Sequence, residues 1–297
     1  MTNRPAIGFI GLGLMGSAMV ERLQSLGYPM TVMANRSRPN VDAAVGRGAT
    51  EVKTAREIAA ASDIVMLCMD TSASVEARMT GEDGVIAGLR PGALVIDFGT
   101  SLPGSTIEIG AKVAQAGGRY MDAPLGRTPA HAVDGKLNIM AAGDPDDFAR
   151  AEPVLKDLGE NVFHVGPLGA GHTLKLINNF YGMTMAVAMS EAFAMADRAG
   201  LPRERLYAVM SAGPLHSGMM DFVKARAIDG KPDALAFTIA NARKDVGYYN
   251  QMADGLGVET LMGTGARRAL GLAKAAGHGN RHVAAMVDFF SVIYTDR

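Results

Sequence analysis

The chain has 297 residues and a mass of 31.1 kDa, about twice the size of a typical single domain, so two domains are expected. Hydrophobic residues make up 48% of the sequence and charged residues 20%, which is typical of globular proteins and excludes an intrinsically disordered chain. The 29 basic and 30 acidic residues give a net charge of −1, so neither nucleic acid nor an anionic membrane is an expected partner.

Short apolar runs alternate with helical patterns through the first half of the chain. Runs typical of buried strands lie at 6–10, 31–34, 63–69, 93–97, 120–123, 137–140 and 162–165. Apolar residues at helical spacing lie at 16–26, 54–61, 75–79, 105–116 and 146–158. This alternation predicts an α/β fold with a doubly wound, mostly parallel sheet.

The pattern changes after Gly166, where strand signals stop and helical periodicity takes over. Residues 172–199 predict one long helix with only four charged residues. Lys175, Asn178 and Asn179 are costly in lipid, so we interpret this segment as a buried helix linking two domains rather than as a membrane span. Further helices are expected at 203–210, 219–227, 239–256, 261–276 and 288–294. The sequence therefore predicts an α/β domain over 1–166 and an all-α domain over 167–297.

A glycine-rich loop joins the first strand to the first helix and reads Gly11-Leu12-Gly13-Leu14-Met15-Gly16. In a dinucleotide site, Gly11 allows the tight turn, Gly13 lets the backbone approach a pyrophosphate, and Gly16 lets helix and strand pack closely. The phosphates then bind the unpaired N–H groups at the positive end of the helix. The alternative is a tight turn without a ligand. The position between the first strand and the first helix favours a dinucleotide site.

The residues after the second strand select the dinucleotide, and they read Asn35-Arg36-Ser37-Arg38. NAD sites usually carry a carboxylate here for the ribose hydroxyls, whereas an arginine can hold a 2′-phosphate through charge-assisted hydrogen bonds. The segment therefore predicts NADP(H), with NAD as the second option and a solvated charged turn as the structural alternative. We also place Met69 and Asp70, at the end of the run 63–69, in the cofactor site.

Lys175 is the candidate catalytic residue. It begins an otherwise apolar helix, where desolvation would lower its pKa and allow proton exchange near neutral pH. Asn179 lies four residues further along, on the same helix face, and would orient the lysine or hold a substrate oxygen. The alternative is an ordinary surface lysine near the start of a helix.

Several segments, which together cover nearly the whole chain, resemble the β-hydroxyacid dehydrogenase family (3-hydroxyisobutyrate dehydrogenase-like), and they fall in the family order. The matching segments are Phe9 to Gly16, Asp122-Ala123-Pro124, Gly135 to Met140 followed by Ala142-Gly143, Gly169 to Asn179, and Lys244-Asp245.

This resemblance implies a role for each matching position. Lys175 would be the proton donor and acceptor, with Asn179 assisting it. Lys244 would lie near the cofactor, and Thr100 would lie beside the nicotinamide ribose. The family fold is a Rossmann-like, NADP-binding domain followed by an all-helical domain of the 6-phosphogluconate dehydrogenase type for substrate binding and oligomerisation. Members commonly form homodimers or homotetramers.

One segment departs from the family pattern. The usual Ser-Gly-Gly after Asp-Ala-Pro is replaced by Leu125-Gly126-Arg127-Thr128, and an arginine fork there can bind an anionic head group. This form resembles the sulfolactaldehyde reductase branch, whose members carry an acidic residue after the second strand, unlike Asn35 here. We assign the substrate to Gly126, Arg127, Thr128 and Asn178. A carboxylated or phosphorylated substrate also suits Arg127, and the structural alternative is an arginine that braces the domain junction.

Together these features predict an oxidoreductase that transfers a hydride between NADP(H) and a small anionic aldehyde or β-hydroxyacid. A substrate of the 3-sulfolactaldehyde type is favoured, and 3-hydroxyisobutyrate, tartronate semialdehyde and succinic semialdehyde are alternatives. An imine reductase or a non-catalytic dinucleotide-binding protein are minor alternatives, because Lys175, Asn179 and Lys244 are all present.

Other signals are weak. His278 and His282 are four residues apart, but no third ligand is evident, so we expect no metal site. The one cysteine, Cys68, excludes an internal disulfide framework and lies in an apolar run, so we expect an inert buried thiol. No secretory signal is visible, so a soluble cytoplasmic protein is expected.

Overall fold

The computed structural model describes residues 4–35, 38–231 and 235–295 and divides into two compact units, Met1–Lys175 (unit 1) and Leu176–Arg297 (unit 2). The division falls inside the long helix, after the boundary expected at residue 166. The reason is local: the backbone N–H groups of Gly169 and His172 bind the side chain of Asp122, so the first turn of the helix is part of unit 1.

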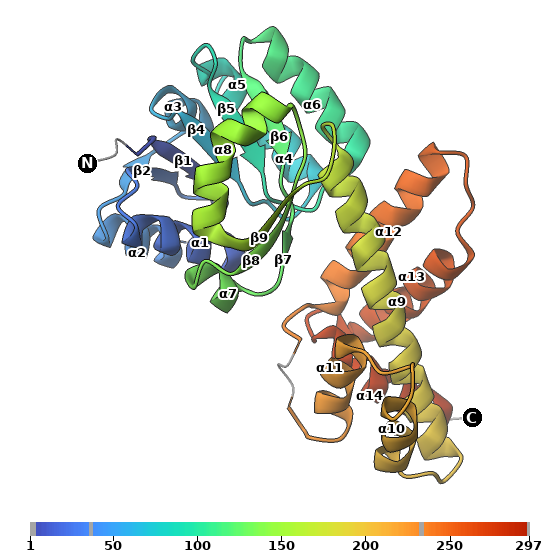
Figure 1. Cartoon of the computed structure of the whole chain (residues 1–297). Coiled ribbons are helices and arrows are strands. Elements are labelled where there is room, and N and C mark those ends of the chain that lie inside the picture. The colour runs from blue at the N-terminus through green and yellow to red at the C-terminus, as the bar shows by residue number, and fades with distance from the viewer. Residues whose placement is uncertain (1–3, 36–37, 232–234, 296–297) are drawn as a thin grey trace. The chain divides into compact units, whose positions relative to one another are not determined.

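Unit 1 contains a six-stranded sheet in which every neighbouring pair of strands is parallel. The strand order is β3-β2-β1-β4-β5-β6, which is the doubly wound order, and it reverses between β1 and β4. This confirms the predicted fold class (Figure 1). The strands are β1 (Ile7–Ile10), β2 (Met30–Met33), β3 (Thr50–Val52), β4 (Ile64–Leu67), β5 (Leu94–Asp97) and β6 (Arg119–Asp122).

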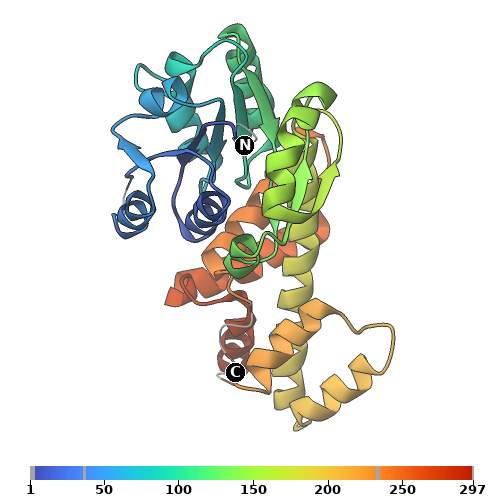
Figure 2. The ribbon, with the colours of Figure 1, turned by 60° about the vertical axis from the view of Figure 1, so that its left-hand side comes forward.

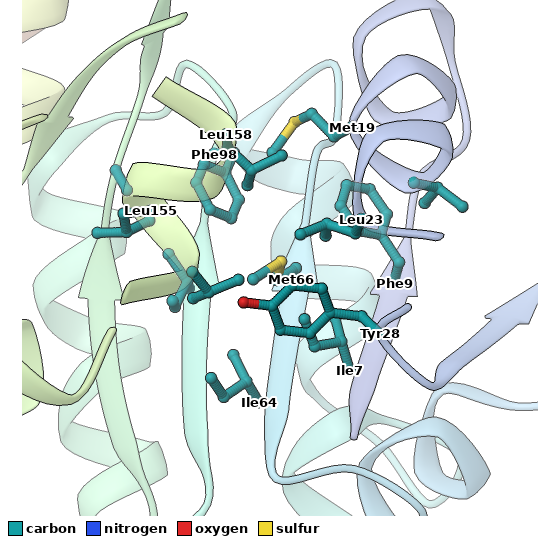
Figure 3. Close-up of a cluster of buried hydrophobic side chains, with 14 of the residues drawn as sticks. Ile7, Phe9, Met19, Leu23, Tyr28, Ile64, Met66, Phe98, Leu155 and Leu158 are labelled. Atoms are coloured by element: carbon teal, nitrogen blue, oxygen red, sulfur yellow. The ribbon is translucent and has the colours of Figure 1, made fainter. Parts of the chain in front are cut away.

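Helices cover both faces of this sheet, because the buried strands are apolar on both sides. One core joins Phe9 and Met66 to Met19, Leu23 and Leu158, as Figure 3 shows. A second core lies on the opposite face and includes Ile58 and Ile109. The helices are α1 (Leu14–Ser25), α2 (Pro39–Gly46), α3 (Ala55–Ala60), α4 (Ser72–Met79), α5 (Val85–Gly88), α6 (Pro103–Gln115), α7 (Pro129–Val133) and α8 (Pro145–Leu158).

A smaller sheet follows β6 and has the order β7-β8-β9, with β7 antiparallel and β9 parallel to β8. A bridge between Asp122, at the end of β6, and Ala142, just after β8, links the two sheets. Helix α8 packs against β9 (Figure 2). The strands are β7 (Leu125–Gly126), β8 (Leu137–Ala141) and β9 (Gly159–His164).

The sequence analysis missed five short elements of unit 1, namely α2, β3, α5, α7 and β7. Four of them, β3, α5, α7 and β7, have at most five residues, too few to show a period. The edge strand β3 also has two exposed residues, Thr50 and Glu51, and so lacks the apolar run of a buried strand.

The regular elements in the described residues of unit 2 are helices, as predicted, apart from one isolated bridge between Thr238 and His282. Its core joins Met183 and Phe193 of the long helix to Val246, Leu270 and Met286. None of the helices in the described ranges is long and apolar enough to cross a membrane. The long helix α9 (Ala170–Arg198) continues from unit 1 and is followed by α10 (Arg203–Ser211), α11 (Gly218–Ala227), α12 (Ile239–Gly255), α13 (Leu261–Ala273) and α14 (Met286–Thr295).

Candidate functional site

The predicted cofactor residues of unit 1 lie at the carboxyl ends of neighbouring strands. Gly11 follows β1, Met69 follows β4 and Thr100 follows β5, and these three strands are adjacent in the sheet. A Cβ placed on Gly11 would come within 2.9 Å of the Met69 sulfur, so the first two segments are in contact. This edge, beside the point where the strand order reverses, is where doubly wound sheets bind their ligands.

The glycine loop has the geometry that a pyrophosphate site needs. Gly11 has a φ of +98°, in the left-handed region, and a Cβ on Gly16 would lie 2.0 Å from the Gly11 carbonyl oxygen. A Cβ on Gly13 would meet no described atom within 4 Å, and no side chain in the described part caps the first N–H groups of α1. Leu14 is 78% exposed. The residues present therefore fit a dinucleotide phosphate at the start of α1.

The structure describes the segment after β2 only in part, since Arg36 and Ser37 lie outside the described residues. The side chain of Asn35 accepts a hydrogen bond from Arg78 of α4 at 2.7 Å. Arg38 is engaged elsewhere, since its guanidinium pairs with Glu51 at 2.7 Å and with Asp42 at 2.7 Å. Arg36 is therefore the arginine to test for 2′-phosphate binding. Sequence reasoning missed Arg78, which is 43 positions from Asn35 and carries no local signal.

The loops after β4 and β5 are each held by a carboxylate. Asp70 is exposed and accepts a hydrogen bond from the Ser74 hydroxyl at 2.7 Å, at the first turn of α4. Asp97, at the end of β5, accepts the N–H of Gly99 at 2.8 Å and the hydroxyl of Ser101 at 3.1 Å. Half-buried Thr100 lies between these two contacts, so its backbone position is fixed.

The first turn of α9, which carries Lys175, is anchored in the interior of unit 1. The carboxylate of Asp122 accepts the N–H groups of Gly169 at 2.8 Å and His172 at 2.7 Å, and so acts as the cap of the helix. Burial raises the pKa of Asp122, and these hydrogen bonds together with His172 act in the opposite direction. Lys175 is half-buried and follows His172 by three residues, a little under one turn.

Two predicted residues of unit 2 contact the carboxylate of Asp245, to which sequence reasoning gave no role. Buried Asn179 donates its amide N–H to Asp245 at 2.6 Å, and the Lys244 ammonium lies 3.0 Å from the other oxygen of Asp245. Exposed Asn178 donates to the amide oxygen of Asn179 at 3.4 Å. The Lys244 ammonium also lies 5.4 Å from the centre of the Tyr248 ring. Asp245 therefore orients the Asn179 amide.

The predicted substrate loop is held within unit 1. Arg127 has a φ of +76° and is the one non-glycine residue in the described ranges with a positive φ. Its Nη1 donates to the Lys136 carbonyl at 2.7 Å and pairs with Glu160. The Thr128 hydroxyl lies 2.7 Å from Nδ1 of His131 in α7. These contacts hold the Arg127 guanidinium within unit 1, so they differ from the domain-junction role that the sequence left open.

The two histidines and the cysteine that the sequence analysis considered form no metal site in the described residues. Gly277, with a φ of +88°, breaks the helix between Lys274 and His278, so His278 and His282 do not share a regular helix face. Throughout the described ranges, no group of three histidine, cysteine or acidic residues is placed to hold a metal ion. Burial, aided by the nearby Asp97 carboxylate, raises the pKa of the Cys68 thiol to about 12, so the thiol stays protonated at neutral pH.

Comparisons with known proteins agree with this geometry. Residues 6–166 match the model of the NAD binding domain of 6-phosphogluconate dehydrogenase, and residues 169–290 match the model described as NAD-binding of NADP-dependent 3-hydroxyisobutyrate dehydrogenase. The chain is 31% identical to the 3-sulfolactaldehyde reductase of Escherichia coli (strain K12) over 283 residues, covering 95% of each protein. It is 32% identical to the 2-hydroxy-3-oxopropionate reductase of Escherichia coli (strain K12) over 250 residues, covering 84% of this chain and 85% of that protein.

A solved structure gives the same result. The 3-hydroxyisobutyrate dehydrogenase of Mycobacterium tuberculosis, solved with L-serine, superposes with a TM-score of 0.85 at 25% identity, covering 96% of this chain and 99% of that one. The family models, the relatives and the fold confirm the resemblance read from the sequence motifs. The chain therefore belongs to the β-hydroxyacid dehydrogenase family of NAD(P)-dependent oxidoreductases.

Proposed function

We propose that this enzyme transfers a hydride between NADP(H) and a small anionic aldehyde or β-hydroxyacid, with Lys175 as the general acid and base. The observation that carries the proposal is the anchored first turn of α9, which holds the half-buried Lys175 three residues beyond His172. Bound nicotinamide supplies or accepts the hydride. The Lys175 ammonium donates the proton that the developing alkoxide needs, and its amine takes that proton back in the reverse direction.

The neighbours of Asn179 define its part in the proposal. Because the Asn179 amide N–H is bound to Asp245, the amide oxygen, which also accepts a hydrogen bond from Asn178, has a second lone pair for a substrate hydroxyl or for an ammonium. Lys244 is paired with Asp245, so we propose that its ammonium contributes N–H donors, rather than net charge, to the cofactor. Asn178 is exposed and contributes to substrate binding.

The cofactor preference rests on the segment after β2. Asn35 replaces the carboxylate that usually binds the ribose hydroxyls of NAD, and Arg36 supplies a positive charge for a 2′-phosphate. Gly11 to Gly16, with Met69, Asp70 and Thr100, complete the proposed cofactor site. NADPH is the proposed reductant, and NADH is the weaker alternative.

Arg36→Asp is expected to reverse this preference. The substitution removes the guanidinium and adds a carboxylate that accepts the ribose hydroxyls and repels a 2′-phosphate, so the ratio of kcat/KM for NADPH to that for NADH should fall about 100-fold or more. Steady-state kinetics with both cofactors measure the ratio. Arg38→Asp is the matched control and should change it little, because Arg38 already pairs with Glu51 and Asp42. If the unsubstituted enzyme used NADH as efficiently as NADPH, the prediction would be wrong.

The favoured substrate is of the 3-sulfolactaldehyde type. The supporting observations are the 31% identity to the Escherichia coli reductase of that name and Arg127 with Thr128 in the substrate loop. 3-Hydroxyisobutyrate, tartronate semialdehyde and succinic semialdehyde are the alternative substrates. The decisive experiment measures kcat/KM for short aldehydes that carry sulfonate, carboxylate or phosphate, each with NADPH and NADH. Absence of turnover with every anionic aldehyde would refute the proposal.

Arg127 is tested by a pair of substitutions that separate binding from backbone strain. A left-handed φ costs an arginine about 1 kcal/mol, and its exposed ion pair with Glu160 returns less than about 1 kcal/mol. Arg127→Gly should therefore keep or raise the thermal midpoint, whereas Arg127→Ala should lower it. Both should raise KM for the anionic aldehyde about tenfold or more and leave KM for NADPH unchanged. An unchanged aldehyde KM in both variants would make Arg127 purely structural.

A cytoplasmic homodimer or homotetramer completes the proposal. Several large apolar side chains of unit 2 are exposed in the single chain, including Val209 at 76%, Leu256 at 73% and Leu261 at 81%. Large exposed apolar side chains such as these are typical of a surface that another subunit covers. Sedimentation velocity at micromolar concentration should give a mass of two or four chains, and a monomer would contradict this part of the proposal.

A further inference from the structure

Three ionisable side chains meet in the interior of unit 1. Asp97 and Asp122 end two neighbouring strands, β5 and β6, and His172 lies in the first turn of α9; each is at most 1% exposed. The His172 ring lies between the two carboxylates, with Nε2 3.8 Å from Asp97 and Nδ1 3.7 Å from Asp122. Burying such groups is costly unless they are paired. The pairing offsets part of this cost, and the further contacts of each group show which segment it holds.

Each carboxylate holds a different segment of the proposed active site. Asp97 binds Gly99 and Ser101, and so fixes the loop that carries Thr100. Asp122 binds the N–H groups of Gly169 and His172, and so fixes the start of the helix that carries Lys175. The His172 ring is packed between the two carboxylates that hold these segments.

Two further contacts leave the first turn of α9 little freedom. The hydroxyl of Thr106, in α6, lies 2.7 Å from Nδ1 of His172, which fixes the ring from a third element. A Cβ on Gly171 would lie 2.4 Å from the Met140 carbonyl oxygen and 2.8 Å from the Asp122 carboxylate, so the helix backbone lies directly against β8 and Asp122. The turn before Lys175 is therefore locked to β5, β6, β8 and α6.

We propose that Asp97, His172, Asp122 and Thr106 form a positioning cluster that keeps the Thr100 loop and the Lys175 helix turn in one fixed geometry for proton and hydride transfer. The cluster touches neither reactant and acts through Lys175, so the inference rests on the proposed function of that residue. Its physical basis is that a misplacement of about 1 Å in a reacting group can cost about 100-fold in rate.

Thr106 is the best residue to change, because valine has nearly the shape of threonine and lacks the hydroxyl. Replacing His172 would instead leave two buried carboxylates facing each other and would threaten folding. Thr106→Val should lower kcat for aldehyde reduction about tenfold, because the ring and the helix turn lose one fixed contact. The dissociation constant of NADPH should change less than about twofold. Thr106→Ser keeps the hydroxyl and should restore kcat to within about twofold of the natural enzyme.

A stability control separates positioning from general loosening of unit 1. Val113 is a fully buried residue of the same helix and takes no part in the cluster. Val113→Ala should lower the thermal midpoint at least as much as Thr106→Val, because it leaves a cavity, yet keep kcat. An equal loss of kcat in Val113→Ala, or a normal kcat in Thr106→Val, would overturn the positioning role.

A double-mutant cycle separates this inference from the proposed function. If Thr106 acts through Lys175, Thr106→Val should have no further effect on the residual rate of Lys175→Ala. If the two losses multiply, the cluster does not act through Lys175, and the inference fails while the role of Lys175 stands. If Lys175→Ala alone keeps full activity, the proposed function fails first, whatever Thr106→Val does.

Discussion

Lys175→Ala is expected to lower kcat for aldehyde reduction about 1000-fold while NADPH binds as tightly as before. General acid catalysis contributes about 100- to 10,000-fold, and the lost ammonium acts only as the alkoxide forms, so kcat and kcat/KM should fall together. Stopped-flow kinetics and NADPH fluorescence titration measure the two effects.

Two controls make this result specific. Lys156, an exposed lysine of α8 that pairs with Glu152, gives the matched variant Lys156→Ala, which should keep its natural kcat. A small primary amine added to Lys175→Ala should restore part of the lost rate, because the cavity left by the side chain admits a substitute proton donor. Full turnover by Lys175→Ala, with normal cofactor affinity, would remove Lys175 from the mechanism.

The second large effect is expected in the glycine loop, where Gly13 and Gly16 have different functions. Gly16→Ala should lower the free energy of unfolding by about 3 kcal/mol, because its Cβ would meet backbone at 2.0 Å and force α1 away from β1. Gly13→Ala should leave stability unchanged, because its Cβ meets open space. It should nevertheless weaken NADPH binding about tenfold or more, since that space is where a pyrophosphate approaches the backbone.

Thermal unfolding of the two variants measures the effect on stability, and NADPH titration measures the effect on cofactor binding. Gly104→Ala, at the start of α6, is the matched control, because its Cβ would also meet no described atom within 4 Å and no cofactor is proposed there. Its NADPH affinity should stay natural, and its thermal midpoint should stay the same or rise, because alanine favours a helix more than glycine does. Natural NADPH affinity in Gly13→Ala would place the pyrophosphate elsewhere, and natural stability in Gly16→Ala would contradict the tight packing of α1 on β1.

The fold was largely predictable because its major elements carry strong local signals. The strands that pair across the sheet centre, such as Ile64–Leu67 and Leu94–Asp97, are apolar on both faces and therefore appear as continuous apolar runs. The helices of unit 2 are long enough to show a period. The missed elements were short or, like β3, lay at an exposed sheet edge where burial does not select apolar residues.

The sequence by itself determined the family, the fold class and the residues proposed for chemistry, because glycine spacing, Lys175 and Asn179 are local patterns that need no knowledge of distant contacts. Only the tertiary structure decided which partners these residues have. Asp245 holds Asn179 across 66 positions, and Asp122 caps α9 from 47 positions away. Arg127 pairs with Glu160, 33 positions further on. Such contacts depend on how strands and helices pack, and no spacing within the chain encodes the distance between two side chains on different elements.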